Sequence, residues 1–207
     1  MKVIVLAPHT DDGEFGCGGV INKLIQEGND VYYIAFSACK QSVLPQFPTD
    51  ILITEVQEAT KVLGVKPEHL ILYDFEVRTF SYHRQSILDI LIKLRNELKP
   101  DLVFLPSSND IHQDHHTIAI EGMRAFKNTT ILAYEIPWNN FTFNTTSFFM
   151  LNEINIESKI LALQQYKSQT HKAYANEDFI RSLARTRGVQ IGGKYAEVFE
   201  VVRWVIK

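Results

Sequence analysis

Val3-Ile-Val-Leu-Ala-Pro-His-Thr-Asp-Asp-Gly-Glu14 joins an apolar run directly to a polar, acidic turn. The run from Val3 to Ala7 is rich in β-branched residues, which is typical of a strand that is buried on both faces of a parallel sheet. Apolar residues then recur at helical spacing over residues 16–26, and a Gly-Asn-Asp sequence at 28–30 ends that helix before a second apolar run at 31–36. This part of the chain therefore predicts a strand–helix–strand unit.

Further along the chain the same alternation continues. Residues 51–63, 87–98 and 117–126 have helical spacing, and short apolar runs at 70–72, 102–106 and 131–134 predict strands. This alternation favours an α/β fold, with a Rossmann-like, doubly wound and mostly parallel sheet and helices on both faces. The last third, with strands expected at 148–151 and 198–206 and helices at 158–165 and 178–185, is expected to be a C-terminal α/β appendage. Because no Pro/Ser-rich linker separates it, we expect residues 1–207 to form a single domain.

The composition is that of an ordinary globular protein. The chain has 207 residues, of which 45% are hydrophobic and 22% charged, so it can bury a core without disulfides or a structural metal. Its 21 lysine and arginine residues and 24 aspartate and glutamate residues give a net charge of -3. This balance supplies no basic surface for nucleic acid or an anionic membrane, and we expect neither as a partner.

Two cysteines, Cys17 and Cys39, are too few for a disulfide framework and lack the spacing of a zinc knuckle, which fits a reducing compartment. The first apolar run is shorter than a signal-peptide core of ~7–15 residues and far shorter than a membrane span of ~20. We therefore expect a cytoplasmic protein without a membrane span. The sequence leaves the oligomeric state open, including a homo-oligomer.

Chemistry-bearing side chains gather in two segments, residues 8–14 after the first predicted strand and residues 109–116 after the fourth. Four of the seven histidines lie in them, namely His9, His112, His115 and His116. In the common strand order 3-2-1-4-5 the first and fourth strands are neighbours, and ligands bind beyond the carboxyl ends of the strands at this switch point. The topology therefore predicts that the two segments meet.

Imidazole nitrogens and carboxylate oxygens are ligands of catalytic zinc, which typically uses three protein groups and keeps a fourth position for water. His9 and Asp12 could both face inward from one tight turn, and a histidine of the second segment would complete the set. Asp11 would then be a free carboxylate able to take a proton from water. Taken alone, either aspartate is more typical of a turn or a helix cap, and the second segment is what favours chemistry. Spacing leaves the second segment open, because His112 and His116 at i and i+4 could also chelate a metal on a helix.

These motifs resemble the LmbE-like or PIG-L-type zinc-dependent deacetylases of N-acetylated sugars. The first signature of that family, Pro-His-Pro-Asp-Asp-Glu followed by glycines, is similar to Pro8-His-Thr-Asp-Asp12 and Glu14-Phe-Gly-Cys-Gly-Gly19. Its second, His-x-Asp-His, matches His112-Gln-Asp-His115. Less specific later signatures resemble Tyr166-Lys-Ser-Gln169, Arg187-Gly188 and Tyr195-Ala-Glu197, so the resemblance covers the whole chain. Thr10 departs from the usual proline, and Gly13 stands where an acidic residue is common.

The resemblance implies a role for each matching residue. Zinc would be bound by His9, Asp12 and His115. Asp11 would be the general base, His112 would polarise or protonate near the scissile amide, and Asp114 would orient a histidine. Contacts to sugar hydroxyls would come from Arg187, Tyr195 and Glu197. Zinc is the expected cofactor, although Fe2+ or Mn2+ would accept the same mixed nitrogen and oxygen ligands.

Sequence and resemblance together predict a metal-dependent hydrolase that removes acetyl from an N-acetylated amino sugar, such as N-acetylglucosamine, or from its glycoconjugate. Its partner would be that small molecule. Two alternatives stay open: a non-catalytic nucleotide or small-molecule binding module, and a metallohydrolase of another amide or an ester. A nicotinamide site is disfavoured, because Gly13, Gly16 and Gly18 lack the spacing of the dinucleotide fingerprint.

Overall fold

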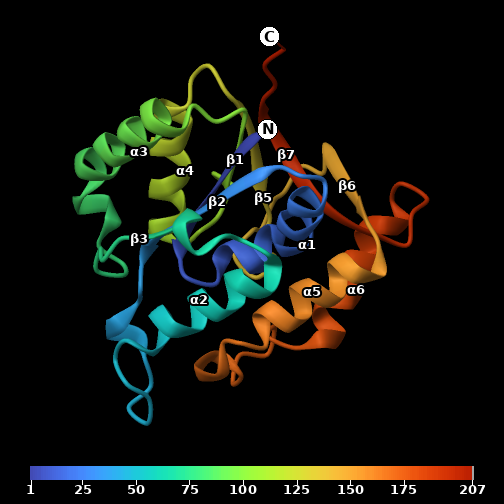
Figure 1. Cartoon of the computed structure of the whole chain (residues 1–207), viewed down its shortest axis with the longest axis horizontal. Coiled ribbons are helices and arrows are strands. Elements are labelled where there is room, and N and C mark those ends of the chain that lie inside the picture. Colours follow the sequence, from blue (N-terminus) through green and yellow to red (C-terminus); the bar gives the residue numbers. More distant parts are fainter. Residues whose placement is uncertain (207) are drawn as a thin grey trace.

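A seven-stranded sheet forms the centre of the computed structural model, which describes residues 1–206 (Figure 1). Its strand order is β3-β2-β1-β4-β5-β7-β6. Strands β1 to β5 are parallel to one another, whereas β7 runs antiparallel to both β5 and β6. The bounds are Lys2–His9 (β1), Asp30–Ser37 (β2), Leu70–Leu72 (β3), Leu102–Pro106 (β4), Thr130–Tyr134 (β5), Ser147–Leu151 (β6) and Tyr195–Arg203 (β7). The α/β class and the order 3-2-1-4-5 are therefore confirmed.

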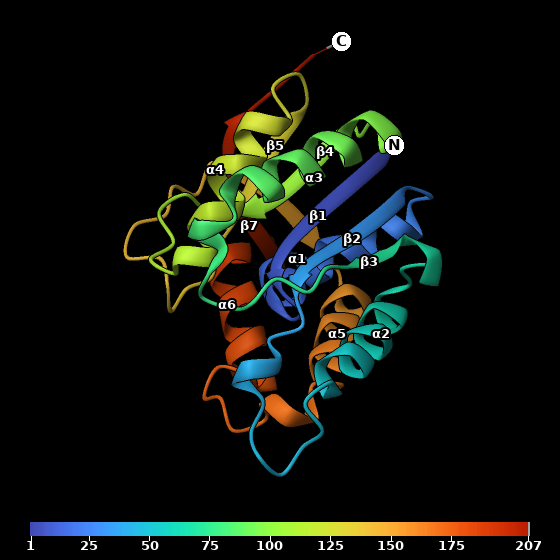
Figure 2. The same ribbon diagram turned by 90° about the vertical axis from the view of Figure 1, so that its left-hand side faces the viewer.

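Helices cover both faces of this sheet. Figure 2 shows α3 and α4 on one side of β1 and β2, with α2 and α5 on the other. The bounds are Asp12–Gln26 (α1), Ile51–Leu63 (α2), Arg84–Leu98 (α3), Gln113–Ala125 (α4), Glu153–Leu163 (α5) and Glu177–Val189 (α6). Short 3-10 turns lie at Lys40–Ser42, Pro67–His69, Phe80–Tyr82 and Lys167–Gln169. Within residues 1–206, no helix combines the length and apolarity needed to cross a membrane.

The apolar run of β1 supplies both cores of the molecule. Val3, Val5 and Ala7 pack into the core that α1 and α2 cover, whereas Ile4 and Leu6 pack into the core beneath α3 and α4. All five residues are 0% exposed. Because both faces of this strand are buried, its sequence shows no alternation of apolar and polar residues.

Helix α1 begins at Asp12, earlier than the predicted start at residue 16. The glycines of its first turns are positions of close packing. A Cβ atom at Gly13 would lie 2.5 Å from the Tyr33 ring of β2, and one at Gly16 would collide with the Tyr134 ring of β5. Close packing of α1 on the sheet therefore requires glycine at both positions.

Other element starts also differ from the prediction. Helix α4 begins at Gln113 rather than residue 117, with His112 as its N-cap. Histidine is not among the usual cap residues, so the pattern gave no start signal. Helix α5 begins at Glu153 rather than residue 158, because Asn152 and Asn155 form a reciprocal capping box. Strand β7 starts at Tyr195 and ends at Arg203, whereas 198–206 was expected.

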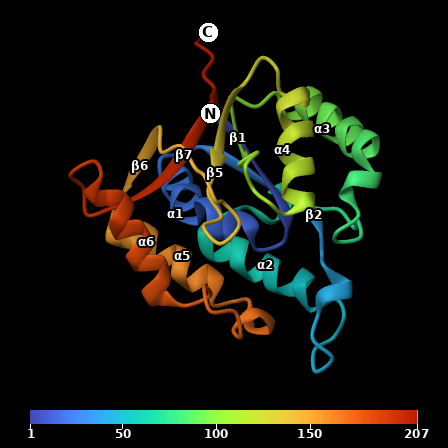
Figure 3. The ribbon, with the colours of Figure 1, turned by 180° about the vertical axis from the view of Figure 1, so that it is seen from behind.

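The last third of the chain extends the central sheet. Strand β7 pairs with β5 and carries β6 at the sheet edge. Helix α5 packs on α1 and α2, and α6 packs on β7 (Figure 3). The loop between α5 and α6 thereby reaches the turn after β1, where the Tyr166 hydroxyl donates to the Thr10 carbonyl at 2.7 Å.

Candidate metal centre

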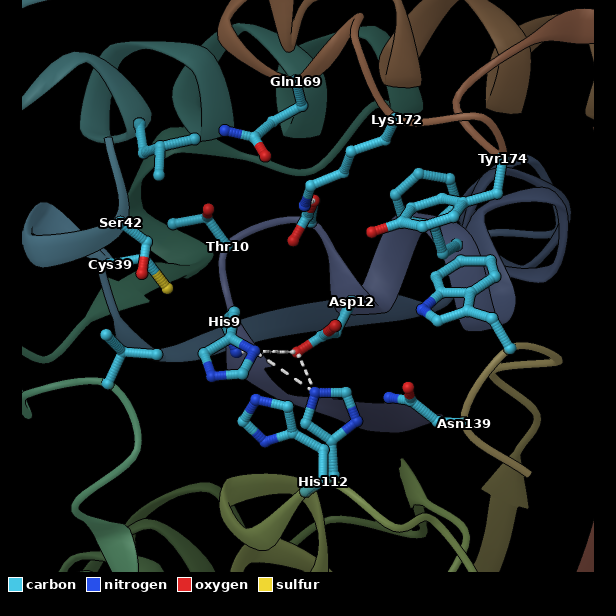
Figure 4. A pocket seen from close by; sticks show the side chains of 16 residues that line it. His9, Thr10, Asp12, Cys39, Ser42, His112, Asn139, Gln169, Lys172 and Tyr174 are labelled. Carbon is cyan, nitrogen blue, oxygen red and sulfur yellow. Dashed lines mark hydrogen bonds and ion pairs between the residues drawn. The ribbon is translucent and has the colours of Figure 1, made fainter. Parts of the chain in front are cut away.

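The two polar segments meet at the carboxyl ends of β1 and β4, as the strand order predicts. Strand β1 ends at His9 and α1 begins at Asp12, so both side chains leave one tight turn. His115 lies in the first turn of α4, which follows β4. Figure 4 shows His9 and Asp12 facing one another, with His112 beside them.

Three candidate ligand atoms form a nearly equilateral triangle. His9 Nδ1 lies 3.2 Å from Asp12 Oδ2, and His115 Nε2 lies 3.1 Å from the same oxygen and 3.2 Å from His9 Nδ1. A tetrahedral zinc ion with bonds of ~2.0–2.1 Å requires ligand atoms ~3.3–3.4 Å apart. These residues therefore fit a divalent ion with only small side-chain shifts.

Each imidazole of the triangle is held from behind by a second carboxylate. His9 Nε2 lies 3.0 Å from Asp114 Oδ2, and His115 Nδ1 lies 2.7 Å from Asp110 Oδ2. Because an ionised carboxylate only accepts, these nitrogens donate, and once each ring is neutral the lone pair of its opposite nitrogen faces the triangle. Asp114 is itself fixed by two backbone N–H donors, those of Arg78 at 2.6 Å and Phe80 at 3.2 Å.

The charges around the triangle stabilise an ionised Asp12 and a protonated His115. Burial alone would raise the pKa of Asp12, but the adjacent His115 and His9 outweigh it and hold that pKa well below its usual value. Burial likewise opposes ionisation of His115, yet the charges of Asp12 and Asp110 raise its pKa to about 10. Metal ligands bind in their deprotonated forms, so an ion entering this site would displace a proton.

His112 lies beside the triangle. Its ring centroid is 4.8 Å from that of His9 and 4.7 Å from that of His115. Burial, together with those two histidines, lowers the pKa of His112 to about 4. Its Nδ1 accepts the backbone N–H of Asp114 at 3.2 Å, so the neutral ring carries its proton on Nε2. A neutral imidazole with a free N–H suits a group that polarises a carbonyl.

Two other ligand sets can be compared with the triangle. His9, His112 and His115 also offer nitrogens within 4.8 Å of one another, which is a looser group than the one containing Asp12. The structure does not bring His116 to the site. It is exposed, and its Nδ1 lies 3.1 Å from the Ser108 carbonyl oxygen. Because α4 begins at Gln113, His112 is its N-cap. Of the two histidines in the first turn of the helix, His115 faces His9 and His116 does not.

Asp11 occupies the N-cap position of α1 but makes no capping hydrogen bond. The Gly13 N–H that a cap could accept donates instead to the Tyr33 hydroxyl at 3.0 Å. Asp11 Oδ2 lies 3.4 Å from Lys172 Nζ, on the loop between α5 and α6. The carboxylate therefore stays directed to the cavity rather than to the helix.

A buried acid supports the turn from below. Glu14 is 0% exposed, and its oxygens hydrogen-bond to the hydroxyls of Tyr33 and Tyr166. Both hydroxyls also contact the Thr10 carbonyl, at 2.8 Å and 2.7 Å. Burial raises the pKa of Glu14 to about 8, although the tyrosine hydrogen bonds favour its charged form. The tyrosines thus fix the turn at the position where Thr10 replaces the proline of the family signature.

A cavity of about 290 Å³ opens beside these residues (Figure 4). On one side Trp138 and Tyr174 stack with ring centroids 3.6 Å apart and an interplanar angle of 9°. Figure 4 places Lys172 between Tyr174 and Gln169, with Cys39 and Ser42 on the opposite side from Tyr174. The volume is just below the ~300–1,000 Å³ range for small-molecule sites, which suits about one sugar ring.

The structure does not bring the three expected sugar contacts to this cavity. Arg187 forms a two-pronged ion pair with Glu135, at 2.9 Å and 2.6 Å. Glu197 is buried, pairs with Lys159 at 2.6 Å, and accepts two backbone N–H groups of α1, those of Gly19 and Val20. Tyr195 is buried as well, at 8% exposure. Arg187 and Glu197 form ion pairs that hold helices to the rest of the fold, and none of the three expected residues lines this cavity.

Sequence reasoning missed the cavity residues of the loop between α5 and α6. Gln169 lies in a quoted signature but had no assigned role, and nothing in the spacing of Lys172 or Tyr174 signals a site. Their placement depends on how α5 and α6 dock. Asp110 was also missed, although an acid shortly before a histidine pair is a recognisable candidate for orienting one of them.

The sequence matches the family described as GlcNAc-PI de-N-acetylase, PIG-L, over residues 4–126. This range is more than half of the chain and contains the triangle, Asp11 and His112. The chain belongs to this family. One relative of this chain is the diacetylchitobiose deacetylase of Thermococcus kodakarensis. The two sequences are 24% identical over 220 residues, which cover 95% of this chain and 81% of the relative. Deacetylases are therefore its homologues.

Solved structures share the fold along the whole PIG-L chain. The conserved protein TT1542 of Thermus thermophilus has a TM-score of 0.82 at 22% identity, with 99% of this chain and 96% of that one covered. GalB, the 4-carboxy-2-hydroxymuconate hydratase of Pseudomonas putida, has a TM-score of 0.79 at 17% identity, with 100% and 98% covered. Because both a hydratase and deacetylases have this fold, the fold alone does not determine the reaction.

Proposed function

We propose that this PIG-L chain is a zinc-dependent hydrolase that removes the acetyl group from an N-acetylated amino sugar or a glycoconjugate of one. The observation that carries the proposal is the triangle of His9 Nδ1, Asp12 Oδ2 and His115 Nε2 beside a cavity of sugar-ring size. Family membership supports deacetylation over other uses of the same fold.

The metal would be held by His9, Asp12 and His115. A divalent ion there supplies Lewis-acid polarisation and lowers the pKa of water toward ~7 from 15.7. Zinc is the ion proposed, and Fe2+ or Mn2+ suit the same donor set. Asp114 and Asp110 keep the two imidazoles in the tautomer that offers a lone pair to the ion.

Two residues outside the ligand set carry the proton chemistry. Asp11 takes the proton of the water whose oxygen attacks the acetyl carbonyl. The Nε2–H of His112 donates to the oxygen that becomes negative. When the carbon–nitrogen bond breaks, Asp11 returns that proton to the departing amine. The products are acetate and a free amino sugar.

The substrate is a small molecule whose sugar lies against the aromatic and polar side of the cavity. Trp138 and Tyr174 offer rigid apolar surface, and Gln169 and Asn139 offer amide groups. Since the cavity uses residues from both the first and the last third, we propose that residues 1–207 act as one unit. The two free, buried cysteines fit work in a reducing compartment such as the cytoplasm.

The decisive experiment pairs metal analysis with acetate release. Purified protein is assayed for bound zinc, iron and manganese, then incubated with free, nucleotide-linked and lipid-linked N-acetylglucosamine. We expect about one metal per chain and acetate from at least one substrate. Protein without metal that only binds the sugar would indicate a binding module. Stoichiometric metal with cleavage restricted to other amides or esters would keep the machinery and overturn the substrate.

A further inference from the structure

The Asp11 carboxylate depends on the last third of the chain for its orientation. At the N-cap of α1 it would ordinarily turn back to accept a first-turn N–H. Here the Asp11 side chain forms no capping hydrogen bond. The Gly13 N–H, which it could have accepted, donates to the Tyr33 hydroxyl instead. Within residues 1–206, the hydrogen bonds and ion pairs of this carboxylate go to Lys172 alone, at 3.4 Å.

The loop that carries Lys172 is anchored on both sides of it. On the amino-terminal side, the Ser168 N–H and hydroxyl bond the buried Glu55 at 2.9 Å and 2.6 Å. On the carboxyl-terminal side, Tyr174 stacks on Trp138, and Phe15 packs edge-on against both rings. A lysine on a loop held at two points is presented in a fixed place rather than free in solvent.

The surroundings keep Lys172 charged and partly shielded. Its side chain is 28% exposed and that of Asp11 is 12% exposed. Burial opposes the ammonium, but the negative charge of Asp11 and the neighbouring Tyr174 raise the pKa of Lys172 above its usual value. Lys172 Nζ also lies 5.7 Å from the centre of the Tyr174 ring.

We propose that Lys172 is a positioning residue for deacetylation: its ammonium holds Oδ2 of Asp11 and leaves the other carboxylate oxygen directed at the attacking water. This inference rests on the proposed function. It assigns the loop between α5 and α6 a part in the chemical step, beyond lining the cavity. The alternative use of the same ammonium is recognition of an anionic group on the substrate, and the two uses affect different kinetic constants.

The test is a double-mutant cycle. Lys172→Met and Lys172→Arg are made in the native chain and in an Asp11→Asn background, and Lys167→Met, an exposed lysine of the same loop, is the matched control. Because misplacement of a catalytic group by ~1 Å can cost ~10²-fold, we expect Lys172→Met to lower kcat by about 10–100-fold. KM and metal content should change little, and Lys172→Arg should recover most of the rate. In the Asp11→Asn background, Lys172→Met should have no further effect.

Each other outcome contradicts the inference in a recognisable way. A raised KM with unchanged kcat would assign Lys172 to an anionic substrate group. If Lys172→Met lowered kcat equally in the native and Asp11→Asn backgrounds, Lys172 would not act through Asp11. Thermal unfolding shows whether Lys172→Met still folds. If it does not, the folded Lys172→Arg variant is the test. Loss of activity in that variant would contradict a positioning role for the positive charge. Absence of acetate release from the native chain would instead defeat the proposed function, and the positioning role with it.

Discussion

The residues before the end of α4 and those after it contribute to the site in different ways. The first region supplies the candidate ligands and proton-transfer groups, all beside the ends of two parallel strands. The second supplies Trp138, Tyr174 and Lys172 from loops and Gln169 from a short 3-10 turn. The candidate ligands and proton-transfer residues thus lie in two short contiguous motifs. The cavity residues of the second region depend instead on how the later helices dock. The predictions below test this division.

Loss of a ligand from the first region should have the largest effect. His115→Ala removes one corner of the triangle, so we expect the metal and all measurable acetate release to be lost. Asp110→Asn removes only the group that orients His115 and should weaken metal binding by about 10–100-fold. Metal content after dialysis measures both. The matched control is His116→Ala on the same helix, and loss of metal from that variant would show that the wrong histidine was chosen.

Asp11→Asn should come next, with the metal retained. The amide keeps the size of the side chain but has no basic oxygen to take a proton, so kcat should fall by roughly 10²–10⁴-fold. Steady-state acetate release and metal analysis on one preparation measure the two effects. If the variant lost its metal, Asp11 would be a ligand, and full activity would place the general base elsewhere.

His112→Ala should have a somewhat smaller effect on the same step. Removal of one donor to a developing oxyanion lowers kcat on the order of 10²–10³-fold. Because the contact forms mainly in the transition state, KM should change much less. Loss of metal in this variant would favour the looser ligand set of His9, His112 and His115 over the triangle.

The smallest effect on catalysis is expected from Arg187→Ala in the second region. It leaves the buried Glu135 carboxylate without its ion pair, so the free energy of unfolding should fall by about 1–3 kcal/mol. For a chain of this size Tm falls by roughly 2–4 °C per kcal/mol. KM for the sugar should be unchanged. The exposed Arg185→Ala is the control, and a large rise in KM without loss of stability would restore Arg187 as a sugar contact.

The fold was predictable because β1 and its neighbours are buried on both faces. Such strands have continuous apolar sequences, and their order then locates the site at the switch point. The boundaries were less predictable. Glycine is a poor helix former, so Gly13 gave no signal that α1 begins at Asp12. The His112 cap has no ordinary signal either.

The site was predictable where its residues adjoin strand ends. The segment containing His9 and Asp12 and the one containing His115 each follow a strand closely, so topology alone predicts their meeting. Lys172 and Tyr174 owe their positions to Glu55, Trp138 and the docking of α5, which are long-range contacts that no local pattern reports. Arg187 and Glu197 were expected as sugar contacts from the family resemblance alone, and their ion pairs with Glu135 and Lys159 are long-range contacts of the same kind.

The contact of Gly13 with Tyr33 couples substitutions at these two positions. The phenol occupies the volume that any side chain at residue 13 would need, and its hydroxyl binds the N–H of that same residue at 3.0 Å. An acidic residue at 13, as is common in the family signature, therefore requires the Tyr33 ring to move or a smaller residue at 33. Across relatives the two positions should vary together, and exchanging only one of them should yield chains that fold poorly until the other follows.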